Sequence, residues 1–171
     1  MGNKKYNVVI VQMDSESELR DYINQREGVM LGEQTENPSK YYQVELDLYG
    51  EECTIGILNG GHGIEPQVKI IEPELIITSN HMLHIFNVKT RTITNTLEFD
   101  SLIYDVIIPQ NTEAIIVVCE LDVECITNKG SATWSGQSDD IIIDYTLKGD
   151  VITVITEEME QKISLKTGDI V

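Results

Sequence analysis

The sequence predicts a mainly β protein: an antiparallel meander, arranged as a sandwich, an open meander or a small propeller-like fold, with one N-terminal helix. Isoleucine, valine and threonine are abundant and alanine is scarce, which favours strands over helices. From residue 41 onward, apolar and polar residues alternate with the two-residue period of a half-buried strand. A chain of 171 residues can bury one substantial core, so we expect a single domain over 1–171.

Residues 1–40 predict a strand, a helix and a loop. The apolar run at 7–11 is typical of a short buried strand. The segment Ser15–Glu18 fits a capping box, in which the serine and glutamate side chains satisfy free backbone amides. Apolar residues at helical spacing follow it, so we expect a helix near 16–26. The polar stretch 32–40 contains a proline and predicts a loop.

Residues 41–171 predict an antiparallel β meander with an internal repeat. Repeat-like units occur at 75–90, 114–130 and 151–168, and each consists of two apolar runs joined by a turn. Lysines close the three units at intervals of 40 and 37 residues: Lys89, Lys129 and Lys166. Further strands are expected at 42–48, 53–58, 68–71, 92–99, 102–108 and 141–147.

This pattern resembles the blade repeats of β-propellers of the WD40 or quinoprotein-like kind. The resemblance covers about the last hundred residues, through the paired apolar runs and the closing turns. The Trp-Asp and Gly-His marks of WD40 repeats are missing, because Trp134 precedes a serine and Gly61-His62 lies outside the repeat. The resemblance implies sheets of a propeller-like array, and closure of a ring would need a further unit from 41–72. A sandwich, an open meander and a barrel remain open alternatives.

The sequence contains no catalytic, cofactor or metal motif, so we expect no catalytic residues, no cofactor and no metal. An alternative is a metal-dependent hydrolase that uses the three histidines, His62, His81 and His84. This hypothesis requires the three side chains to converge with an open coordination position. The chain also has three cysteines without a zinc-type or redox spacing, and its first residues do not predict a signal peptide. We therefore expect reduced thiols and a cytoplasmic protein.

Acidic residues dominate the charged surface and restrict the class of partner. The chain has 29 Asp and Glu against 12 Lys and Arg, a formal net charge of −17. This charge argues against nucleic acid and against an anionic membrane as ligands, and it favours a basic protein partner. Two acidic clusters, Glu120–Glu124 and Glu157–Glu160, fall at equivalent places in the repeat, where we expect hairpin tips at one edge of the fold.

The functional hypothesis is a non-enzymatic acidic binding protein that docks onto a basic protein surface. Rim carboxylates would steer the partner. The single tryptophan would be an exposed anchor beside them, with a core position between strands as the alternative. The predicted partner-binding residues are Glu120, Asp122, Glu124, Trp134, Glu157, Glu158 and Glu160. A structural scaffold module is the remaining alternative, and solubility alone would also account for acidic hairpin tips.

The overall profile is similar to that of the immunity proteins that neutralise bacterial nuclease toxins. Small size, acidity, one helix followed by many strands and the absence of a catalytic set carry this similarity. It implies an inhibitor whose carboxylates imitate phosphate charge, and the same profile fits a phage-type mimic of DNA. The oligomeric state does not follow from the sequence.

Overall fold

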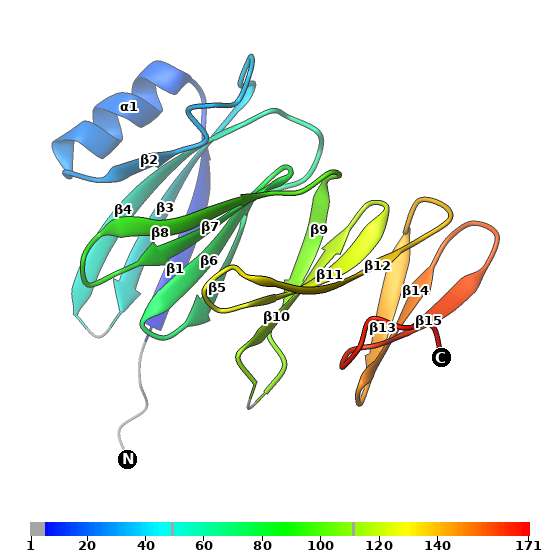
Figure 1. The fold of residues 1–171 in the computed structure, drawn as a ribbon. Helices are drawn as coiled ribbons and strands as arrows, with labels where there is room; N and C mark the ends of the chain where they lie inside the picture. The colour runs from blue at the N-terminus through cyan, green and yellow to red at the C-terminus, as the bar shows by residue number, and fades with distance from the viewer. Residues whose placement is uncertain (1–5, 49, 111) are drawn as a thin grey trace. The chain divides into compact units, whose positions relative to one another are not determined.

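A computed structural model of the chain describes residues 6–48, 50–110 and 112–171 (Figure 1). The chain divides into two compact units, Met1–Thr96 and Leu97–Val171, which we call unit 1 and unit 2. The described residues form antiparallel-rich sheets and a single α-helix, which confirms the predicted fold class. The boundary between the two units lies within one strand.

Unit 1 begins with a four-stranded sheet in the order β1-β3-β4-β2. Its strands are β1 (Tyr6–Met13), β2 (Val29–Leu31), β3 (Lys40–Leu48) and β4 (Glu51–Asn59). β1 and β4 each pair antiparallel with β3, whereas the short β2 pairs parallel with β4. The sequence did not predict β2, because three residues are too few to show a period.

The helix α1 (Glu16–Gln25) packs on one face of this sheet. Ser15 caps it by accepting a hydrogen bond from the backbone amide of Glu18 at 3.2 Å, as the capping box predicts. Leu19 and Ile23 are fully buried against β4. Gly56 on β4 permits this close approach, because a Cβ there would lie 2.8 Å from Ile23 Cγ1.

The second sheet of unit 1 is a meander of strands in sequence order. It consists of β5 (Gln67–Ile71), β6 (Glu74–Ser79), β7 (Met82–Asn87) and β8 (Thr92–Glu98), of which β8 crosses the unit boundary. Leu75, Ile77 and Phe86 project from this meander onto Val44 and Ile55 of the first sheet, and all five side chains are at most 1% exposed. This packing forms the main core of unit 1.

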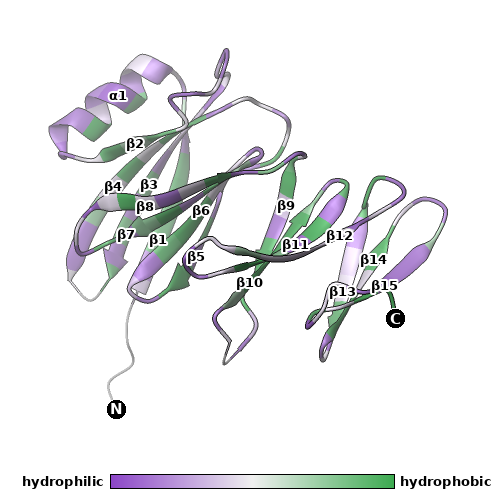
Figure 2. Ribbon diagram, in the orientation of Figure 1, coloured by the Kyte–Doolittle hydropathy of each residue, from purple (hydrophilic) through white to green (hydrophobic). Residues whose placement is uncertain are grey.

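Unit 2 contains two further meanders. The first is β9 (Ile103–Ile107), β10 (Ala114–Cys119), β11 (Asp122–Thr127) and β12 (Ala132–Gln137), and the second is β13 (Asp144–Lys148), β14 (Val151–Ile155) and β15 (Glu160–Ser164). The two sheets pack face to face, with Ile116 and Val118 on one side and Ile152, Val154 and Ile163 on the other. In Figure 2 hydrophobic residues are visible on β9 and β14, whereas β13 is pale and β15 is largely hydrophilic.

The three repeat-like units correspond to the central hairpin or last hairpin of each meander: β6–β7, β10–β11 and β14–β15. Each closing turn has a polar side chain two residues before its lysine. Asn87, Thr127 and Ser164 accept hydrogen bonds from the backbone amides of the three lysines, at 3.1, 3.3 and 3.3 Å. This side-chain turn is the physical origin of the repeated sequence pattern.

Three further strand predictions need correction. The strand expected to be buried at 7–11 is β1, and most of its side chains are exposed. The sequence did not predict β12, because its small and polar residues weaken the apolar signal. The strand expected over 141–147 starts only at Asp144, and residues 141–143 belong to the preceding connection. Among the described residues, no helix is long and apolar enough to cross a membrane.

Candidate functional site

Three chain connections of unit 2 meet at one edge. They are the β10–β11 turn, the β12–β13 connection and the β14–β15 turn. The β12–β13 connection joins them, because the Ile142 amide donates to Glu120 O at 2.8 Å and the Ile143 amide donates to Ile155 O at 2.8 Å. The amide of Ser138 also donates to Leu121 O at 2.9 Å. We call this surface the acidic edge: residues 120–121, 138–143 and 156–160.

The acidic edge exposes carboxylates from two of these connections. Five acidic side chains are exposed: Asp139, Asp140, Glu157, Glu158 and Glu160. Thr156 shapes the last turn, because its Oγ1 accepts hydrogen bonds from the amides of Glu158 at 3.3 Å and Met159 at 3.1 Å. Glu120 is half-buried. The two sequence clusters therefore contribute to the same edge, but only the second one is fully exposed.

Apolar side chains lie among these carboxylates. Four large ones are exposed: Leu121 at 46%, Ile141 at 45%, Ile143 at 59% and Met159 at 49%. No sequence pattern indicated their exposure, and Ile141 and Ile143 fall in a segment that was expected to be a strand. Exposed apolar side chains bordered by polar residues are a feature of many interaction surfaces.

Asp122 does not lie on the surface. It is only 7% exposed, and its Oδ1 atom is buried without a hydrogen-bond partner. Burial raises the pKa of this carboxyl, and the thiol of Cys119 partly offsets that shift while Asp100 adds to it. Burial also raises the pKa of half-buried Glu124, with Asp122 and Asp100 acting in the same direction. The first acidic cluster therefore turns partly inward.

Trp134 is half-buried against the core of unit 2 and is not a fully exposed anchor. Its Nε1 donates to Leu165 O at 3.1 Å, and its ring borders the core between the two sheets. Gly168 lies directly against the ring: its φ is +77°, and a Cβ there would lie 2.7 Å from Trp134 Cε3. The tryptophan thus closes the core, which is the commoner role of a tryptophan on a strand.

The three histidines have separate surroundings. His84 is 2% exposed, and its Nδ1 lies 3.0 Å from Thr96 Oγ1, while Nε2 is buried without a partner. Burial lowers the pKa of His84 to about 4, so the ring is neutral near pH 7. His62 is exposed in a glycine-rich loop and His81 is half-buried. In the described part of the chain, no three His, Cys, Asp or Glu side chains could hold a metal ion together, so the metal-site alternative has no support.

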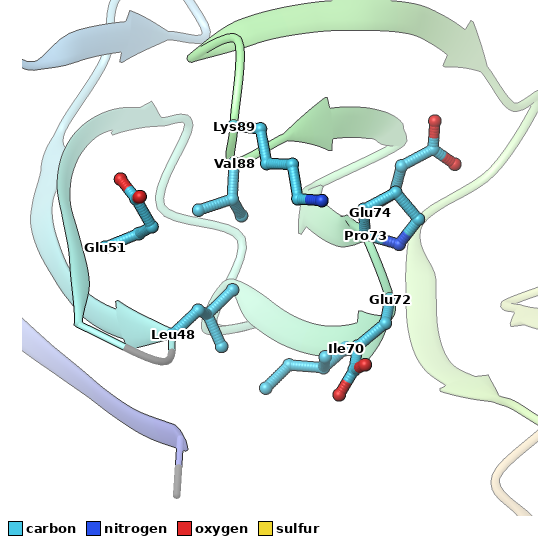
Figure 3. Close-up of a pocket in the computed structure, with 8 residues that line it drawn as sticks. All are labelled: Leu48, Glu51, Ile70, Glu72, Pro73, Glu74, Val88 and Lys89. Atoms are coloured by element: carbon cyan, nitrogen blue, oxygen red, sulfur yellow. The ribbon is translucent and has the colours of Figure 1, made fainter. Parts of the chain in front are cut away.

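Unit 1 has a pocket of about 610 Å³ at the ends of three hairpins (Figure 3). Leu48, Ile70 and Val88 line it with aliphatic side chains, as does Pro73. The charged residues around it are three glutamates and one lysine: Glu51, Glu72, Glu74 and Lys89. No sequence pattern indicates this pocket, because its residues come from separate turns.

Comparisons with known proteins concern the fold. The sequence matches no protein-family model and no curated protein. Among solved structures, BamB from Moraxella catarrhalis is 15% identical over 61% of this chain and 33% of its own length, with a TM-score of 0.52. A chain of the mitotic checkpoint complex is 12% identical over 72% of this chain and 45% of its own, with a TM-score of 0.51.

The CNH domain of AfRom2 is 11% identical over 84% of this chain and 52% of its own length, with a TM-score of 0.50. These neighbours are β-propeller or WD40-like folds. The fold of this chain is propeller-like. The chain spans between a third and about half of the length of these structures, and at such identities the similarity shows the fold alone.

Proposed function

We propose that this chain is a non-enzymatic binding protein whose acidic edge docks onto a basic protein surface. The observation that carries this proposal is the gathering of exposed carboxylates and exposed aliphatic side chains at one edge of unit 2. Neither feature alone indicates a partner, since single exposed apolar residues and acidic turns are both common. Their combination in three adjoining connections supports a docking surface.

The charge of unit 2 supports a basic partner. Unit 2 contains 15 Asp and Glu against four Lys and Arg, a formal net charge of −11 in 75 residues. Unit 1 contains 14 acidic and eight basic residues, a net charge of −6 in 96 residues. Carboxylates at the rim accelerate association with a positive surface, and the aliphatic groups supply the apolar area that slows dissociation.

The finer form of this proposal is an inhibitor of a nuclease-type toxin. A nuclease needs a positive surface to hold the phosphates of its substrate. Exposed carboxylates such as Glu157, Glu158 and Glu160 would occupy that surface by imitating phosphate charge. The half-buried Glu120 would lie at its margin, whereas Asp122 and Trp134 would act only by supporting the edge.

Binding to a purified basic partner tests the proposal. The immobilised chain is incubated with native lysate, and a protein that salt elutes from it is identified. That protein is then produced in pure form, and its binding to the chain is titrated at low and high salt. We expect the triple variant Glu157→Lys/Glu158→Lys/Glu160→Lys to weaken affinity at least about tenfold, since exposed ion pairs contribute roughly 0.2–1 kcal/mol each. For a nuclease partner, the wild-type chain should also inhibit cleavage.

A charge-matched control separates a local surface from a bulk effect. The variant Glu51→Lys/Glu72→Lys/Glu74→Lys changes the net charge equally, but at the pocket of unit 1. We expect this control to retain most of the affinity. Equal losses in both variants, or binding that salt does not weaken, would contradict docking through the acidic edge.

A further inference from the structure

β1 is a sheet edge without the features that normally protect one. It pairs with β3 on one side and ends the β1-β3-β4-β2 order on the other. Its eight residues pair with β3 without a bulge, from Tyr6 opposite Leu48 to Met13 opposite Tyr41. Edge strands usually carry charges, prolines or bulges, or are very short, because a free edge can template pairing with another strand.

The segment Tyr6–Met13 contains no charged residue and no proline, although the chain as a whole is densely acidic. Three consecutive aliphatic side chains are exposed: Val9 at 40%, Ile10 at 37% and Val11 at 40%. Other edge strands of the described residues differ: β2 has three residues, β13 contains Asp144 and Lys148, and the pairing of β12 contains a bulge. β1 is therefore suited to pair with a strand that is itself uncharged and apolar.

We propose that β1 pairs antiparallel with β1 of a second copy of this chain, so that the two sheets join into one. If the two-fold axis is perpendicular to the sheet, the same face of both copies lies on the same side of the joined sheet. Two residues that lie opposite one another across the contact must then have numbers that are equal or differ by an even number. With the axis at Ile10, Ile10 faces itself and Val9 faces Val11. The three exposed side chains then cover one another. With the axis at Val9, Val11 would face the polar Asn7, so the register at Ile10 is the favoured one.

Electrostatics distinguishes this contact from docking at the acidic edge. Each copy has a formal net charge of −17, so two copies repel one another at low salt and meet where β1 carries no charge. Salt screens the repulsion and strengthens self-association. The same salt weakens docking of a basic partner. The two contacts therefore have opposite salt dependence, and this inference does not depend on the proposed function.

Analytical ultracentrifugation of the full chain over a range of concentrations and salt tests the contact. We expect a monomer–dimer equilibrium that salt shifts toward dimer and that Val9→Lys shifts at least tenfold toward monomer. Leu147→Lys is the matched control, because Leu147 is 44% exposed on the edge strand β13 of unit 2. A wild-type chain that stays monomeric, or a dimer that Val9→Lys leaves intact, would overturn the proposal, as would a dimer that Leu147→Lys abolishes.

Disulfide trapping tests the register and does not require a destabilising charge. The native cysteines are buried, so an engineered cysteine on β1 would be the exposed one. Under oxidising conditions Ile10→Cys should form a covalent dimer, because directly opposed Cβ atoms lie within disulfide reach. Val11→Cys should not, because its two copies would be diagonal and too far apart. Trapping at Val11→Cys and not at Ile10→Cys, or at neither position, would overturn the proposed pairing.

Discussion

Unit 1 and unit 2 build their hairpins in the same way, yet they bury titratable groups of opposite kind. In both units a polar side chain accepts a hydrogen bond from the backbone amide of the closing lysine, as Asn87 does in unit 1 and Ser164 in unit 2. Unit 1 buries His84, whose burial favours the neutral, deprotonated ring. Unit 2 buries Asp122, whose burial favours the neutral, protonated carboxyl. Acid should therefore act in opposite directions on the two units.

The largest expected effect is the acid sensitivity that His84 confers on unit 1. Its pKa is about 4 in the folded chain against 6.5 for an ordinary histidine, so the unfolded chain binds the additional proton between these values. Stability is thus complete above pH 6.5 and is lost as the pH falls toward 4, by about 3 kcal/mol. Urea denaturation at pH 7 and pH 4, followed by circular dichroism, measures this loss.

The variant His84→Leu isolates that contribution, because it keeps an apolar side chain in the core and removes the proton acceptor. We expect the acid-induced loss to shrink by about 3 kcal/mol relative to the wild type. His62→Gln is the control, since it removes an exposed histidine from a loop. An unchanged acid-induced loss in His84→Leu would refute the assignment to His84.

A smaller effect concerns the turn that seats Trp134 in unit 2. Gly168→Ala must adopt a positive φ and also push a Cβ against the indole ring, so we expect a loss of about 2–3 kcal/mol. Gly149→Ala is the matched control in the same unit: its φ is +60°, but no atom lies within 4 Å of the added Cβ. It should cost about 1 kcal/mol.

Trp134 fluorescence reports both variants, because this is the only tryptophan in the chain. Equal losses of unfolding free energy in Gly168→Ala and Gly149→Ala would show that the Trp134 ring can be displaced at little cost. Such a result would reopen the interpretation of Trp134 as an exposed anchor. A clear excess in Gly168→Ala would establish its role in the core.

The sequence predicted the repeats better than it predicted the site. The period near forty arises from paired apolar strands and from local turns such as the one at Thr127, and both are visible in the chain order. The inward position of Asp122 is not visible there, because it depends on which face of β11 other strands cover. The exposure of Ile141 and Ile143 depends in the same way on where β13 begins. The clusters Glu120–Glu124 and Glu157–Glu160 were predicted to lie at hairpin tips of one edge, whereas the exposed Asp139 and Asp140 and the apolar residues of the acidic edge were not predicted.

The smallest effect concerns Asp122 and completes the comparison. Its raised pKa means that the folded chain holds the carboxyl proton more firmly than the unfolded chain does. The stabilisation is therefore present below the unfolded value and is lost as the pH rises through the folded pKa. Asp122→Asn replaces the carboxylate with a neutral group of the same shape. We expect it to raise the free energy of unfolding near pH 7, because it removes a buried charge. The gain should be only on the order of 1 kcal/mol, because one buried oxygen still lacks a donor.

Urea denaturation followed by Trp134 fluorescence checks this expectation from acid to neutral pH. In Asp122→Asn the pH dependence of unit 2 should flatten, whereas Glu157→Gln, at an exposed position of the acidic edge, should leave the stability unchanged. A loss of stability in Asp122→Asn near pH 7 would mean that the ionised carboxylate makes favourable contacts. The opposite pH responses of the two units would then no longer hold. If the stability instead rises, burial of Asp122 favours its protonated form. In the proposed docking, the exposed glutamates of the second cluster, Glu157–Glu160, would then make the contacts with the partner.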